Sequence, residues 1–135
     1  MPPAERQRLL VARFAVIEDV QERLAAVVDW ARKLPPLADA ERCGAQRVPG
    51  CVSRVWLIAT VEDGRCRLRM DADSALVKGL AALLCEVFHD TAPAAAAAFE
   101  CDVLDALGFT ARLSATRLHG LAQVQRAIRA FAAAP

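Results

Sequence analysis

One cysteine of the chain stands out by its position. Cys51 lies in the stretch RVPGCVSRVWLIA, directly after a Pro-Gly pair and directly before a run typical of a β-strand. A Pro-Gly pair favours a tight surface turn, where proteins commonly place functional side chains. Arg47 and Arg54 flank the cysteine, and a nearby guanidinium group favours the nucleophilic thiolate. The residues predict either a reactive loop thiol or an inert cysteine tucked beneath the loop, and they leave both open.

The other four cysteines lack a comparable setting. Cys66 alternates with apolar residues in RCRLRMD, and Cys85 lies in the apolar run LAALLCEVF, so both are expected in the core. Cys43 falls in a polar segment, and Cys101 lies just ahead of a predicted helix. The total of five is odd and no CxxC pair occurs, which argues against a disulfide framework or a zinc motif. We expect reduced thiols in a cytoplasmic protein.

Two histidines and one lysine complete the set of side chains that could take part in catalysis. His89 or His119 could form a Cys–His pair with Cys51, although sequence alone does not show proximity. His89 falls at the end of a predicted helix, where an imidazole interacts favourably with the helix dipole. Lys78 is expected to extend to solvent from the first turns of a helix. The sequence contains neither a glycine-rich phosphate loop nor a metal-binding motif.

Length, composition and charge limit the fold and the partners. The chain has 135 residues, which suits a single domain spanning 1–135, and 56% of them are hydrophobic. Aromatic residues make up only 5%, which favours packed helices. The formal net charge of +1 argues against nucleic-acid binding. The longest apolar run, residues 79–85, is too short to span a membrane, and the charged amino terminus is unlike a signal peptide.

Hydrophobic periodicity predicts an α+β fold, with several helices packed on a small antiparallel sheet of about three strands. Residues 53–61 and 65–71 are predicted strands joined by a Glu-Asp-Gly turn, and a further short strand is expected near residues 45–48. A central buried helix is predicted over residues 75–89, and the last helix is expected to begin at Ser114 or Thr116. Further helices are predicted over residues 4–18, from residue 20 to Pro35, in the alanine run 94–98, and in DVLDALG.

Four segments follow one another in an order that resembles the SufE family of cysteine desulfuration proteins. They are VVDWARKLPPL, RVPGCVSRVWL, DADSALVKGLAALL and ATRLHGLAQVQRAIRA, and the similarity runs from about Val20 to Ala130. The Gly-Cys-x-Ser-x-Val-Trp core is the most specific part. The resemblance implies the SufE/IscU-like form of an α+β fold.

The resemblance also implies a function, that of a sulfur acceptor. A SufE-like protein takes persulfide sulfur from a pyridoxal-phosphate cysteine desulfurase (SufS-like), stimulates that enzyme, and relays the sulfur to an iron–sulfur scaffold (SufB-like). Cys51 matches the acceptor cysteine. Such an accessory protein forms a covalent persulfide without turning over a small substrate alone, and the pyridoxal phosphate belongs to its partner. The chain itself is expected to hold no cofactor and no metal, and a homodimer is compatible with the sequence.

Residues around the acceptor receive supporting roles through the same resemblance. Gly50 shapes the turn, Ser53 is expected to bond backbone groups of the cysteine turn, and Arg117 matches an arginine of the carboxy-terminal motif with a role in docking or loop support. The family commonly has glutamine where this chain has Val52 and Arg54. Arg54 is therefore expected to place a positive charge near the thiol and to alter its pKa or the choice of partner.

Two other functions remain as alternatives. A stand-alone thiol hydrolase would need His89 or His119 beside Cys51, together with a substrate pocket. An iron–sulfur or zinc scaffold would need three thiols converging near Cys51, whereas Cys66 and Cys85 are expected in the core.

Overall fold

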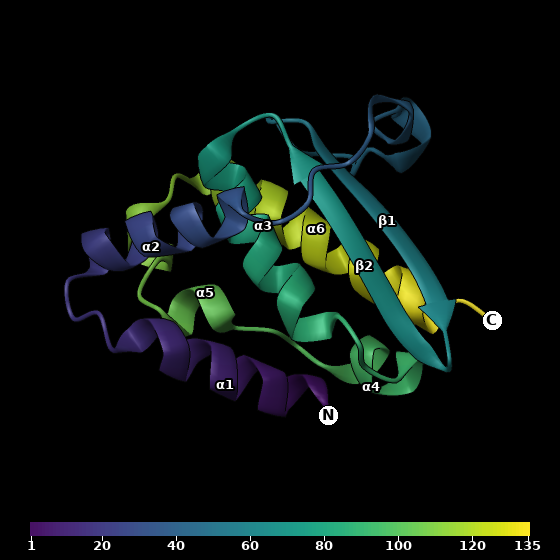
Figure 1. Ribbon diagram of the computed structural model, residues 1–135, viewed down its shortest axis with the longest axis horizontal. Helices are drawn as coiled ribbons and strands as arrows, with labels where there is room; N and C mark the ends of the chain where they lie inside the picture. Colours follow the sequence, from purple (N-terminus) through teal and green to yellow (C-terminus); the bar gives the residue numbers. More distant parts are fainter.

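The computed structural model describes residues 1–135 and shows helices arranged around one hairpin (Figure 1). In chain order the elements are α1 (Pro3–Ala15), α2 (Val20–Arg32), η1 (Asp39–Glu41), η2 (Gly44–Gln46), β1 (Val55–Glu62), β2 (Arg65–Ala72), α3 (Ala75–Phe88), α4 (Pro93–Ala98), α5 (Val103–Ala106), η3 (Thr110–Arg112) and α6 (Ala115–Ala133), where η marks a 3-10 helix. The predicted α+β class is confirmed.

The sheet is a single antiparallel hairpin. The pairing of β1 with β2 begins with Val55 opposite Ala72. Asp63 and Gly64 connect the strands, with φ angles of 54° and 73°. Positive φ at both central residues is what a type I′ turn requires, and its twist matches that of the flanking strands. The turn residues and the strict alternation of β2 therefore define this hairpin.

The predicted number of about three strands is wrong by one, since the sheet has two strands. The expected strand near residues 45–48 is reduced to an isolated bridge between Arg47 and Trp56. The 3-10 turn η2 occupies the residues before Arg47, and Pro49, two residues after Arg47, has no N–H to donate. The segment is thus too short to extend the ladder.

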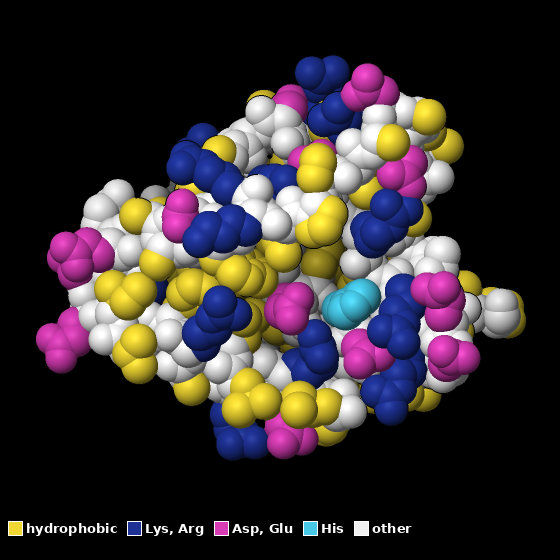
Figure 2. Space-filling model, in the orientation of Figure 1, with side chains coloured by type: hydrophobic (Ala, Val, Ile, Leu, Met, Phe, Trp, Pro, Cys, Tyr) yellow, Lys and Arg dark blue, Asp and Glu magenta, His cyan; other side chains and the backbone are white.

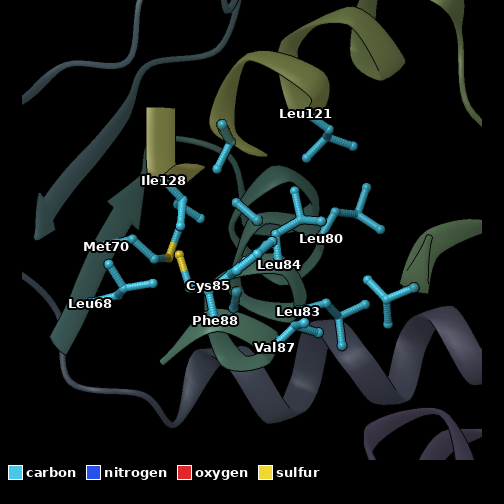
Figure 3. Packing of buried hydrophobic residues seen from close by; sticks show 14 of the residues in the cluster. Leu68, Met70, Leu80, Leu83, Leu84, Cys85, Val87, Phe88, Leu121 and Ile128 are labelled. Atoms are coloured by element: carbon cyan, nitrogen blue, oxygen red, sulfur yellow. The ribbon is translucent and has the colours of Figure 1, made fainter. Parts of the chain in front are cut away.

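Helix α3 forms the centre of the hydrophobic core. It packs against α1, α2, β2 and α6, and Figure 1 shows it between the hairpin and the α1–α2 pair. Ten of its 14 residues are buried, which agrees with an apolar pattern on nearly every side. Side chains of β2 and α6 pack against those of α3, and the sulfur of Cys85 is directed toward that of Met70 (Figure 3). Cys66 and Cys85 are buried, as predicted.

Side-chain caps fix where three helices begin. Asp19, Ser74 and Ser114 each accept a hydrogen bond from the backbone N–H three residues later. These bonds satisfy N–H groups that have no partner inside the helix. For α6 the cap decides between the two candidate starts, because Ser114 is used rather than Thr116.

Charged side chains of both signs are interspersed on the face shown in Figure 2, around an exposed apolar area. That face therefore carries no extended stripe of a single sign. The helices of the chain are also too short or too polar for any of them to span a membrane.

Gly79→Ala is expected to lower the free energy of unfolding, although alanine is the better helix former. A Cβ on Gly79 would lie 3.2 Å from the Cα of Val28 on α2. A backbone atom cannot rotate away, so the two helices would have to separate. Overpacking costs about 1–3 kcal/mol, against about 1 kcal/mol gained in helix propensity. Urea unfolding measures the difference, and equal stability of the variant would show that the helices yield. Gly44, with no heavy atom within 4 Å of a Cβ, supplies the Ala control.

Candidate functional site

Cys51 lies on a short loop whose base is tied to the hairpin. Arg47 bridges to Trp56 on the amino-terminal side of the loop. Gly50 has a φ of +84°, in the left-handed region that residues with a side chain seldom adopt. The turn expected from the Pro-Gly pair is therefore present, and it directs the cysteine toward α6.

The Cys51 thiol rests against α6. Its Sγ donates a hydrogen bond to the carbonyl oxygen of Gly120 at 3.2 Å, across 69 residues of sequence. The side chain is half-buried. Burial raises the pKa of the Cys51 thiol, and the charge of Arg47 offsets that rise only in part. At rest the sulfur is thus sheltered, and the charge of Arg47 does not outweigh the burial that favours the protonated thiol.

A cavity of about 240 Å³ opens beside the thiol. Its walls are mainly apolar and come from β1, α3 and α6, while polar side chains of the α6 amino terminus stand at one side. The lining consists of Cys51, Val52, Ser53, Val55, Val77, Ser114, Thr116, Arg117, Gly120, Leu121 and Val124. This space can take up a small group attached to the sulfur.

The expected effect of Arg54 on the Cys51 pKa is not found, and its guanidinium group is engaged by other residues. Its Nε donates to the carboxylate of Asp73 at 3.1 Å, and its Cζ lies 5.7 Å from the ring centroid of Trp56. The two backbones also bond each other, with the N–H of Asp73 donating to the carbonyl of Arg54 at 3.0 Å. Arg54 therefore ties the carboxy-terminal end of the loop to the β2–α3 turn, and Arg47 is the cation that acts on the Cys51 pKa.

Ser53 and Arg117 both border the cavity beside Cys51. The hydroxyl of Ser53 makes no hydrogen bond within the chain, so the expected bonds to the cysteine turn are absent. Arg117 sits in the first turn of α6, held by its backbone N–H to the hydroxyl of Ser114 at 3.2 Å. Its guanidinium group forms no ion pair and is available to an anion or a partner.

Neither histidine forms a pair with the cysteine. The Nε2 of His119 lies 3.7 Å from where a Cβ of Gly50 would be, yet the thiol donates to Gly120 instead. His89 accepts the N–H of Leu68 at Nδ1, 3.0 Å away, and burial lowers its pKa. It follows the carboxy-terminal end of α3, about 20 Å along the helix from the end that borders the cavity. The geometry gives the hydrolase alternative no catalytic pair.

The thiols also do not converge. Cys43 is exposed, and burial raises the pKa of Cys85 to about 12 and that of Cys101 to about 11. No three His, Cys, Asp or Glu side chains are grouped so as to hold a metal ion. The ligand set required by the scaffold alternative is therefore not formed.

Gly120 is the site residue that sequence reasoning missed. It is buried in α6, and its carbonyl oxygen accepts the hydrogen bond of the Cys51 thiol. A glycine inside an otherwise helical pattern costs stability and usually has a packing reason. A glycine inside the helical pattern LHGLAQV was therefore a signal for close packing, but the residue that packs on Gly120 is Cys51, which lies 69 residues away.

Comparison with known proteins gives consistent results. Residues 8–132 match the SufE family, an Fe-S metabolism associated domain. An uncharacterized SufE-like protein of Synechocystis sp. is 32% identical over 111 residues, 82% of this chain and 70% of that protein. The chloroplastic quinolinate synthase of Oryza sativa subsp. japonica is 36% identical over 94 residues, which are 69% of this chain but only 13% of the rice protein.

A solved structure supports the fold. The solution structure of a hypothetical protein from Thermus thermophilus superposes with a TM-score of 0.77 at 23% identity, over 98% of this chain and 95% of that one. The matched family segment contains the Cys51 loop, the cavity and the Gly120 contact. The resemblance read from the sequence motifs is thereby confirmed, and the chain belongs to the SufE family of Fe-S metabolism associated domains.

Proposed function

We propose that this chain is a cytoplasmic sulfur acceptor. Cys51 takes persulfide sulfur from a pyridoxal-phosphate cysteine desulfurase of the SufS type, and the chain stimulates that enzyme. The sulfur then passes to iron–sulfur cluster assembly on a SufB-like scaffold. The observation that carries the proposal is the Cys51 thiol, mounted on a turn beside an apolar cavity, in a chain of the SufE family. Pyridoxal phosphate is the partner's cofactor, and this chain needs none.

The transfer is a displacement at sulfur that needs no external oxidant or reductant. The Cys51 thiolate attacks the outer sulfur of the desulfurase persulfide, and a new S–S bond forms at Sγ. The S–S bond in the desulfurase breaks, and its cysteine leaves as a thiolate that takes up the proton lost by Cys51. The rate depends on the thiolate fraction and on access, as in thiol–disulfide exchange. Both are low at rest, so the loop must leave Gly120 before attack.

The loop also carries the features of a docking element. Val52, next to the acceptor, is 80% exposed, which is unusual for an apolar side chain and suits contact with an apolar surface of a partner. Arg117 borders the same cavity without an acidic partner. Its charge is placed to stabilise a persulfide anion or an acidic group of the desulfurase.

Peptide mapping by mass spectrometry tests the proposal. The protein is incubated with a SufS-type desulfurase and cysteine, and the peptides are analysed without reductant. We expect added sulfur on the peptide that contains Cys51, lost on treatment with dithiothreitol. The exposed Cys43 supplies an internal comparison. Sulfur found on Cys43 and absent from Cys51 would contradict the proposal.

A further inference from the structure

The Cys51 loop and helix α6 meet through two glycines. A Cβ on Gly120 would lie 3.5 Å from the Sγ of Cys51 and 3.6 Å from its Cα. A Cβ on Gly50 would lie 3.0 Å from the Cγ of Gln123 and 3.7 Å from the Nε2 of His119. Each element thus lacks a side chain where the other passes. This close approach brings the thiol within hydrogen-bond distance of a helix carbonyl.

We propose that Gly120 and Gln123 are positioning residues, an inference that rests on the proposed acceptor function. They hold the sulfur of Cys51 in its resting position against Gly120 of α6, a position that we call the seat. The bare Cα of Gly120 admits the sulfur to the helix surface. One turn further along, the side chain of Gln123 supports the Gly50 end of the same loop. One contact is with the cysteine itself and the other is at the residue before it, and together they fix where the side chain of Cys51 can rest.

The seat controls the state of the nucleophile. A thiol can donate to the Gly120 carbonyl, whereas a thiolate has no proton to donate and would face a partly negative oxygen. Ionisation of Cys51 therefore favours departure from the seat, and a looser seat makes the thiolate more available. Among the charged groups nearby, Arg47 acts on the thiol pKa, Arg117 lines the cavity, and His119 lies against Gly50.

Two substitutions at Gly120 distinguish a side chain that the seat can accommodate from one that fills it. The measurement is the rate at which iodoacetamide alkylates Cys51, followed on the Cys51 peptide so that Cys43 does not interfere. Alanine at this position makes only ordinary contacts, so Gly120→Ala is expected to react within about twofold of wild type. Gly120→Leu fills the seat and displaces the loop, and we expect alkylation to be about tenfold faster. Gly44→Leu, on an open surface, controls for adding leucine.

Gln123→Ala tests the same seat without adding volume to the core. It removes the side chain that supports Gly50, and we expect Cys51 alkylation to rise about threefold. In both Gly120→Leu and Gln123→Ala the pH at half-maximal alkylation should fall, because burial raises the thiol pKa and release reverses that effect. A purely structural role would leave this pH unchanged.

The inference is overturned if Gln123→Ala, together with any folded Gly120→Leu, alkylates at the wild-type rate and pH. If Gly120→Leu does not fold, Gln123→Ala alone decides. Alkylation requires no desulfurase, so this result is independent of sulfur transfer. If the variants alkylate at the wild-type rate while the wild-type protein gains sulfur at Cys51, the seat alone is rejected. If the variants alkylate faster but the wild-type protein gains no sulfur, the acceptor function alone is rejected.

Discussion

Cys51→Ala is expected to abolish the reductant-labile gain of sulfur when the protein is incubated with a SufS-type desulfurase and cysteine. It is also expected to remove stimulation of the desulfurase. No other thiol can replace it, since Cys66 and Cys85 are buried, and neither the exposed Cys43 nor the half-buried Cys101 lines the cavity that Cys51 borders. Burial also raises the pKa of Cys85 to about 12. Intact mass spectrometry and the rate of alanine release measure the two effects.

The loss should not reflect unfolding. Cys51 is half-buried and its side chain makes one hydrogen bond, so its truncation is expected to cost about 1 kcal/mol of stability or less. Cys43→Ala is the matched control, because it removes an exposed thiol from the same polar connection between α2 and β1. We expect this variant to gain sulfur and to stimulate the desulfurase as the wild type does.

The opposite result would have a clear meaning. If Cys51→Ala still gains labile sulfur and still stimulates the desulfurase, the loop thiol is incidental. Family membership would then describe the fold of this chain without describing its chemistry.

Local sequence was sufficient to predict those features of the fold that a short segment determines by itself. The hairpin follows from turn residues that adopt positive φ and from the alternation of Cys66, Leu68 and Met70. The Pro-Gly turn at Cys51 follows from the same chemistry, because Gly50 takes up a φ of +84°. The central position of α3 follows from its apolar surface. These features depend on propensities within a few residues.

Predictions failed where long-range contacts decide. Arg54 is close to Cys51 in sequence, but it pairs with Asp73, 19 residues away, and so leaves the thiol to Arg47. The seat of the thiol depends on Gly120, 69 residues away. Arg54 meets Asp73 because the register that pairs Val55 with Ala72 continues one residue outward, and this follows only once the hairpin is formed. No spacing rule connects Cys51 with Gly120, because tertiary packing of α6 brings them together. The sequence thus singled out the candidate nucleophile, whereas the resting position of its sulfur required the structure.

The buried carboxylate of Asp71 gives the largest stability prediction. It is 4% exposed and accepts the backbone N–H of Leu37 at 3.1 Å. Lys78 and Arg42 approach the same carboxylate at 3.5 and 3.6 Å. Lys78, which was expected to extend to solvent, instead has a side chain only 14% exposed. Asp71 therefore joins the connection that leads to Cys51 to the base of α3.

Asp71→Ala is expected to lower the free energy of unfolding by about 3–5 kcal/mol, because it leaves the ammonium group of Lys78 buried without a partner. Urea unfolding measures the loss. Asp39→Ala is the control, since Asp39 also pairs with Arg42 but its side chain is 97% exposed, and its removal should cost no more than about 1 kcal/mol. Equal stability of the two variants would show that Lys78 reaches solvent once the carboxylate is gone. The burial of that lysine would then be a consequence of the ion pair and would not be imposed by the surrounding fold.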